Sequence, residues 1–162
     1  MAEKDLKELL VHTLKDVYFA EHEILKALPE MEAAARHAPL QEAFAVHRQQ
    51  TEGQIERLKQ VFQVLGEKAE GVPCLAIQGI LAEGREVMEE FAGGPALDAG
   101  LIAAAQAVEH YEIARYGALR SWAELAGLDE ADDLLEQTLD EERATDELLT
   151  EIAEGMVNVE SV

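Results

Sequence analysis

Apolar residues recur with a helical period along almost the whole chain, and this pattern limits the fold more than any other feature. In each of five segments they return every three or four residues, the spacing of one face of an α-helix. Glycine and proline are few and clustered, whereas a many-stranded β fold needs frequent turns. Aromatic residues make up only 5% of the chain, so the core must consist mostly of leucine, alanine, isoleucine and valine. The sequence therefore predicts an all-α protein.

Five helices are expected, four of them long. Their expected bounds are 3–28, 39–65, 73–91, 95–126 and 129–155. Pro29 is expected to kink or end the first helix, because the residue before a proline avoids the α region, although the apolar pattern continues weakly to Ala35. Gly66 and Gly127 are expected to stop the second and fourth helices, and Asp129 to cap the start of the fifth.

Four long helices and one short one predict a four-helix bundle. The short helix over 73–91 is expected in the connection between the second and the fourth segments. A bundle with one long crossover is the ferritin-like arrangement, whereas a simple up-and-down bundle needs no middle segment. No stretch of the sequence reads as a linker between domains, so residues 1–162 are expected to form a single domain.

Charge and composition narrow the classes of partner. The formal net charge is -21, which repels phosphate backbones and predicts no nucleic-acid partner. No apolar run is long enough to span a membrane, and the charged N-terminus lacks the apolar region of a signal peptide. Cys74 is the single cysteine, so no intramolecular disulfide is possible. A cytoplasmic protein without a membrane partner is expected.

Polar residues interrupt the apolar stripe near the middle of each long helix. They are Glu21, His47, Glu109, Glu112 and Glu142, with Asp146 one turn beyond on the same side of the last helix. An ionised carboxylate in an apolar core must be paired, hydrogen-bonded, protonated or bound to metal. If the helices face one another, these side chains converge in one central layer. Arg115 is the obvious basic neighbour there, and a metal cation would serve as well.

A layer of glutamate and histidine suits iron or manganese. Di-iron bundles supply a glutamate from each of two helices and a Glu-x-x-His pair from each of the other two. Glu109 and Glu112 are three residues apart, and Glu142 and Asp146 four apart, so each pair projects from one helix face. No helix carries Glu-x-x-His, which departs from the di-iron pattern.

The competing interpretation is a structural layer without metal. Polar layers in bundles can set helix register, and buried glutamates can accept hydrogen bonds from Thr51, Tyr18 or Gln54. His47 is then a core histidine with its hydrogen bonds made. Tyr18 and Tyr116 are expected near the layer, either as core residues or as phenols that hydrogen-bond a carboxylate. The protein is in that case a non-catalytic structural or interaction bundle, whose layer sets register and dimerisation.

Several segments carry a family resemblance. They are Leu14–Glu21 with the following Ala27–Pro29, Ala43–His47 with Gln54–Leu58, Leu101–Gly117, and Thr138–Asp146. These segments resemble the YciE/YciF ferritin-like stress-response family, within the rubrerythrin and ferritin superfamily. The resemblance covers nearly the whole chain, and Leu101–Gly117 is its most specific part.

The resemblance implies a ferritin-like bundle, usually dimeric, linked to bacterial stress responses and carrying a di-metal centre. It implies ligand positions at Glu21, Glu109, Glu112 and Glu142, with His47 and Asp146 in place of the missing histidines. Glu109 and Glu142 are the expected bridging ligands. Gln49 and Gln50 stand where relatives tend to carry glutamates. The expected function is oxidation of bound iron or manganese by peroxide or oxygen, in a homodimer.

Overall fold

The computed structural model describes residues 4–162, so the expected helix start at Glu3 lies outside the described residues. Regular structure in residues 4–162 is entirely helical, which confirms the all-α prediction. The elements are α1 (Leu6–Ala34), α2 (Ala38–Leu65), α3 (Leu75–Glu90), α4 (Leu97–Leu125), α5 (Asp129–Ile152), a π-helical turn η1 (Ala153–Val157) and α6 (Asn158–Glu160). Among the described residues, none of the helices combines the length and the apolar character that crossing a bilayer requires.

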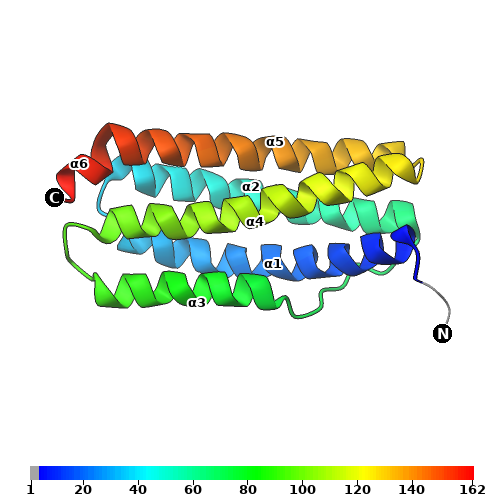
Figure 1. Cartoon of the computed structure of the whole chain (residues 1–162), viewed down its shortest axis with the longest axis horizontal. Helices are drawn as coiled ribbons and strands as arrows, with labels where there is room; N and C mark the ends of the chain where they lie inside the picture. The colour runs from blue at the N-terminus through cyan, green and yellow to red at the C-terminus, as the bar shows by residue number, and fades with distance from the viewer. Residues whose placement is uncertain (1–3) are drawn as a thin grey trace.

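The four long helices form a bundle in which α1, α2, α5 and α4 follow one another around the circumference. Both α2 and α4 start at the end of the bundle where α1 ends, so the chain returns along the bundle between them (Figure 1). The short helix α3 lies in this return and packs against α4 and α1, beside the half of the bundle nearer the C-terminus. One such crossover is the ferritin-like arrangement. The predicted four-helix bundle with a short helix in its crossover is confirmed.

The first helix does not end at its proline. The expected end at Leu28 is wrong, because α1 continues through Pro29 to Ala34. Proline has no N–H, so this turn of α1 lacks one backbone hydrogen bond. Leu28 and Met31 on either side of the proline are buried in the core, and their packing holds the segment in the helix.

Glycine stops two of the helices as the sequence predicts. Gly66 follows α2 with a φ of 70°, and its N–H donates to the carbonyls of Gln63 and Phe62. Gly127, also with a φ of 70°, lies two residues beyond the end of α4. A left-handed residue at this position lets the chain turn while the last carbonyls of the helix find donors.

Two other helix ends differ from expectation. Asp129 is the first residue of α5 rather than its N-cap, and its negative charge there still complements the helix N-terminus. The expected end of the last helix near Gly155 is wrong, because η1 and α6 continue the helical path to Glu160. Ala153 and Val157 are buried in the core, and this burial keeps the terminal segment in place.

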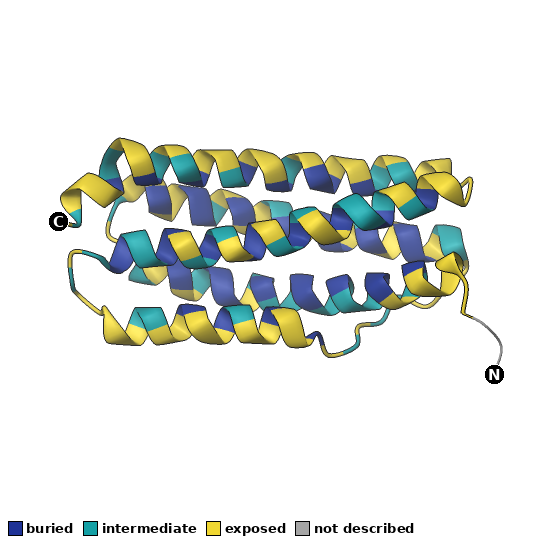
Figure 2. Cartoon of the chain, in the orientation of Figure 1, coloured by how far each residue is buried: buried dark blue, intermediate teal, exposed yellow. Residues whose placement is uncertain are grey.

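The apolar core has two separate parts, which meet at the middle of the bundle. The α3-side core contains the buried residues of α3, of α1 from Ala20 onward, of α4 up to Val108 and of α5 from Leu149 onward. The far core contains the buried residues of α1 up to Val17, of α2 from Leu58, of α4 from Tyr116 and of α5 up to Leu139. Buried positions face inward along every long helix (Figure 2). The polar residues of the predicted layer lie between these two parts of the core.

Candidate metal centre

A layer of buried polar side chains crosses the bundle between the two parts of the core. Its members are Glu21 of α1, His47, Thr51 and Gln54 of α2, Glu109 and Glu112 of α4, and Glu142 and Thr145 of α5. Glu21, Glu112 and Glu142 are 0% exposed, and Glu109 is 1% exposed. The helical period puts each of them on the buried face of its helix, so all five residues predicted from the stripes, these and His47, lie in the layer.

The layer contains two groups of side chains with the spacing of metal ligands. His47, Glu109 and Glu142 each offer one ligand atom, and these atoms lie within 4.8 Å of one another. Glu21, Glu112 and Glu142 form a second group under the same limit. Glu142 belongs to both groups, so its carboxylate lies between two candidate ion positions. The first group offers one nitrogen and two oxygen ligands, and the second offers oxygen alone.

Two neighbours hold these carboxylates in place. The Tyr116 hydroxyl donates a hydrogen bond of 2.5 Å to Glu21 Oε1. The Gln54 side-chain amide donates to Glu142 Oε1 at 2.5 Å and to Glu141 Oε2 at 3.0 Å. Tyr116 contacts only Oε1 of Glu21, and Gln54 contacts only Oε1 of Glu142.

The prediction that buried glutamates accept hydrogen bonds from neighbouring side chains is therefore confirmed for Gln54 and Tyr116. It is wrong for Thr51, which donates to the His47 carbonyl at 2.8 Å, and for Tyr18, which packs against His22 and Phe62.

Many ligand atoms of the layer have no hydrogen-bond partner among the described residues. They are Glu21 Oε2, Glu109 Oε2, both carboxylate oxygens of Glu112, Glu142 Oε2 and both ring nitrogens of His47. His47 Nε2 lies 3.0 Å from Glu109 Oε1, but the two atoms are not aligned as a hydrogen bond. Buried polar atoms are nearly always hydrogen-bonded, so this concentration of unpaired acceptors needs an explanation.

The acidity of the carboxyl groups reflects the same shortage of partners. Burial raises the pKa of Glu21 well above its ordinary range, and repulsion from Glu142 adds to this, although the Tyr116 hydrogen bond opposes it. Burial also raises the pKa of Glu109 and of Glu112, again with a contribution from Glu142. A metal-free layer therefore favours protonated carboxyl groups, whereas a bound cation favours the charged form.

Two residues expected in the layer lie elsewhere. Asp146 is in neither group: its Oδ1 accepts from Gln106 at 3.2 Å and its Oδ2 lies 3.0 Å from His110 Nε2, between α5 and α4. It lies one turn beyond Glu142 on α5, and its contacts with Gln106 and His110 of α4 keep its carboxylate out of the layer. Arg115 is exposed and stacks over the Tyr111 ring.

The basic residue beside the layer is Arg57 rather than Arg115. Its guanidinium donates to both oxygens of Glu141, at 2.5 and 2.9 Å, and to Thr138 Oγ1 at 3.1 Å. Burial opposes ionisation of Glu141, but the hydrogen bonds from Arg57 and Gln54 outweigh it and lower its pKa. Glu141 is thus a paired carboxylate next to the unpaired ones.

α2 supplies His47 to the first group of candidate ligands, and the two glutamines that follow it are not among the buried residues of the layer. Gln49 is exposed, and Gln50 accepts a hydrogen bond from Thr145 at 3.2 Å. Thr51 and Gln54 are further buried polar residues of α2, three residues apart and therefore on one face of the helix. Both stand in the apolar stripe of α2, and the sequence already predicts them as hydrogen-bond donors to buried glutamates.

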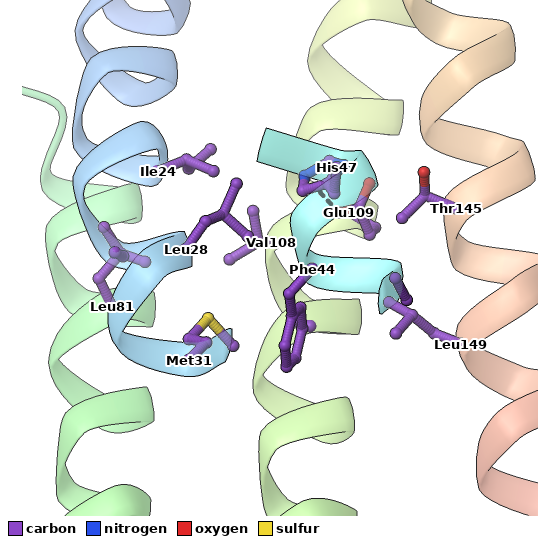
Figure 3. A pocket seen from close by; sticks show the side chains of 13 residues that line it. Ile24, Leu28, Met31, Phe44, His47, Leu81, Val108, Glu109, Thr145 and Leu149 are labelled. Atoms are coloured by element: carbon purple, nitrogen blue, oxygen red, sulfur yellow. Dashed lines mark ion pairs between the residues drawn. The ribbon is translucent and has the colours of Figure 1, made fainter. Parts of the chain in front are cut away.

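A narrow cavity opens onto one side of the layer. Side chains from α1 to α5 line it, and all of these residues are buried. His47, Glu109 and Thr145 gather at one end, whereas Met31 and Phe44 close the opposite end (Figure 3). The cavity lies in the α3-side core and has room for about one water-sized molecule.

The fold and the layer together define a class of protein, the ferritin-like helical bundle with a carboxylate-rich centre. Residues 5–161 match the family model described as the domain of unknown function DUF892. The chain belongs to this family. It is 42% identical to protein YciF of Escherichia coli strain K12 over 156 residues, which cover 96% of this chain and 94% of that protein.

Solved structures of similar proteins agree with the fold. The crystal structure of the E. coli stress protein YciF matches with a TM-score of 0.91, covering 96% of this chain and 99% of that chain at 42% identity. YcfI from Rhodopseudomonas palustris matches with a TM-score of 0.88 at 46% identity, covering 91% and 94%. A protein from Xanthomonas campestris pv. campestris shares the fold alone, with a TM-score of 0.74 at 24% identity, covering 95% and 94%. The family resemblance predicted from the sequence is confirmed.

Proposed function

We propose that the protein binds a pair of iron or manganese ions in the polar layer and couples their oxidation to the reduction of peroxide or oxygen. The observation that carries the proposal is the set of unpartnered ligand atoms in two groups that share Glu142. Carboxylate oxygens with one imidazole nitrogen suit these two metals. The proposal thus accounts for acceptors that no residue of the described chain satisfies.

Each side chain then has a defined part. His47 and Glu109 would hold one ion, Glu21 and Glu112 the other, and Glu142 would be a ligand of both. Glu109, the other expected bridging ligand, offers an atom to the first group alone. Tyr116 orients Glu21, and Gln54 orients Glu142 through the hydrogen bonds described above. The two apolar parts of the core keep bulk water from the layer. A pair of ferrous ions held there would supply two electrons, enough with two protons to reduce dioxygen to hydrogen peroxide or hydrogen peroxide to two water molecules.

The proposal of a role in the stress response comes from the similarity to E. coli YciF. The E. coli structure is that of a stress protein, and a centre that consumes peroxide or oxygen fits such a role. The homodimer, the cytoplasmic location and the single domain predicted from the sequence remain predictions. Sedimentation equilibrium tests the first of them directly.

Elemental analysis of protein purified from iron- or manganese-supplemented cells tests the proposal. One pair of ions per chain is expected, and less than about a tenth of an equivalent contradicts it, because a ligand-rich site retains its metal. Glu142→Ala is expected to lose both ions, whereas Glu147→Ala, an exposed change on the same helix, keeps them.

The same variant separates metal binding from a purely structural layer. A layer that only sets register contains no metal, and Glu142→Ala then breaks a paired network and lowers the free energy of unfolding by about 3–5 kcal/mol. Urea unfolding in the presence of a chelator measures this. A metal-free wild-type protein with such a loss supports the structural bundle instead.

A further inference from the structure

A second cavity lies beside the first and leads outward. It is enclosed by α1, α3 and α4 and is lined at its outer end by Glu30 and Arg85, both exposed. Arg85 Nε lies 3.8 Å from Glu30 Oε2, a weak surface pair. Gly84 of α3 also lines this cavity. Like the first, it has room for about one water-sized molecule.

The two cavities share a wall. Four apolar residues line both of them, namely Ala27, Met31, Leu81 and Val108. The first cavity ends at His47 and Glu109 in the polar layer, and the second ends at the exposed pair on the surface. These four side chains therefore form a wall that the two cavities have in common. Met31 has three rotatable side-chain bonds, so small movements there can join the two spaces.

We infer that the two cavities form a route along which dioxygen reaches the polar layer from the surface beside α3. This inference rests on the proposed function, and it names dioxygen as the oxidant. Dioxygen is small, uncharged and apolar, and space lined by apolar side chains can take up apolar guests such as xenon. The unpartnered atoms of His47 and Glu109 stand at the inner end, where the proposed ions would meet it.

Other candidates fit the route poorly. A metal ion would lose its hydration among four apolar side chains, which is prohibitively costly. Hydrogen peroxide has two hydroxyl groups, and the shared wall offers them no strong hydrogen-bond partner. The chemistry of the wall thus selects an apolar gas over polar oxidants. The short crossover helix α3 then encloses the outer part of the route, and this is its proposed role in the function.

A glycine on α3 allows the route to be closed with a matched control. A Cβ added at Gly84 lies 3.5 Å from the Ala104 Cβ, an ordinary contact, so a larger side chain there extends into the second cavity. A Cβ added at Gly79, on the same helix, meets nothing within 4 Å. Gly84→Leu therefore fills the route, and Gly79→Leu makes the same change on the exposed surface. Circular dichroism checks that both variants remain folded.

The first experiment uses metal-free protein and needs no reaction. Methyl NMR under dioxygen pressure measures how strongly the paramagnetic gas relaxes each buried methyl group. Methyl groups of Met31, Leu81 and Val108 are expected to relax severalfold more than those of Leu14 and Leu119 in the far core. Gly84→Leu is expected to remove most of this difference, and Gly79→Leu to retain it. Equal relaxation in both parts of the core, or no effect of Gly84→Leu, overturns the inference.

The second experiment measures how fast the iron-loaded protein is oxidised by dioxygen or by hydrogen peroxide. Gly84→Leu is expected to slow the dioxygen reaction severalfold and to leave the peroxide reaction and the metal content unchanged. Leu81→Ala, which removes part of the shared wall, is expected to accelerate the dioxygen reaction. Equal slowing of both reactions by Gly84→Leu contradicts a route selective for dioxygen. A protein that binds no metal refutes the proposed function, while the gas experiment still tests the route.

Discussion

Two buried carboxylates of the same helix, Asp98 and Glu112, have opposite surroundings. Asp98 is 1% exposed and accepts hydrogen bonds from the backbone N–H groups of Arg36 and His37, at 3.0 and 2.8 Å. The His37 ring lies 2.6 Å away through Nδ1. Glu112 is 0% exposed, and neither of its oxygens has a hydrogen-bond partner in residues 4–162.

The acidity of these two groups follows their partners. Burial opposes ionisation of Asp98, but the hydrogen bonds from His37 and Arg36 outweigh it and lower its pKa. Burial raises the pKa of Glu112, and repulsion from Glu142 and Glu21 adds to the rise. Burial alone therefore does not distinguish a candidate functional acid from a structural one. The distinguishing feature is whether the structure supplies donors to the carboxylate.

The largest expected effect belongs to the structural acid. Asp98→Ala removes the charged acceptor of two part-buried N–H groups, those of Arg36 and His37, and we expect it to lower the free energy of unfolding by about 3–5 kcal/mol. Urea unfolding measures the change. Asp133→Ala, an exposed change on α5, is the control and should stay within about 0.5 kcal/mol of wild type. A similarly small effect of Asp98→Ala would remove the contrast with Glu112.

Replacing Glu112, the carboxyl group without partners, is expected to raise the free energy of unfolding rather than lower it. Glu112→Met keeps much of the side-chain volume and removes a buried carboxyl group without partners, so it should stabilise the metal-free protein by about 1–4 kcal/mol. Urea unfolding with a chelator present measures the gain. Glu141→Met is the matched control, since Arg57 and Gln54 pair with that carboxylate, and it should destabilise the protein. Destabilisation by Glu112→Met would show that its oxygens are satisfied after all.

Periodicity alone could predict most of the layer, because position around a helix decides burial. Glu21, His47 and Glu142 interrupt apolar stripes, and each is buried at mid-helix. The same argument predicted the bundle and its crossover helix. Gly66 could be identified as a helix stop because a left-handed residue is needed there.

The roles of other residues depend on contacts between distant parts of the chain, which a local sequence pattern does not reveal. Asp98 escaped prediction because its donors, Arg36 and His37, lie 62 and 61 residues earlier in the chain. Asp146 shares a side of α5 with Glu142, but only the packing of α4 decides that Gln106 and His110 meet it. Pro29 breaks an isolated helix, and here burial of its neighbours overrides that preference. Tertiary contacts thus decide between roles that the sequence leaves open.

The smallest expected effect concerns pH and the C-terminal segment. The His37 ring contacts two carboxylates: its Nδ1 faces Asp98, and its Nε2 lies 2.7 Å from Glu160 at the end of α6. Hydrogen bonds to Glu160 and then to Asp98 raise the pKa of His37 above its ordinary 6.5. The stabilisation by protonated His37 is therefore complete below 6.5 and is lost as pH rises through the raised pKa.

We accordingly expect α6 to loosen by about 0.5–1 kcal/mol as His37 deprotonates, the size of an exposed ion pair. The methyl chemical shifts of Val157, which is buried next to α6, should follow the His37 titration. Glu160→Gln should abolish most of this dependence, whereas His12→Gln, an exposed histidine on α1, should leave it intact. Asp98 keeps its charge throughout this pH range because its pKa is lowered. The pH dependence therefore reports the contact between His37 and Glu160. Val157 shifts that stay constant across neutral pH would show that apolar burial alone holds the terminal segment.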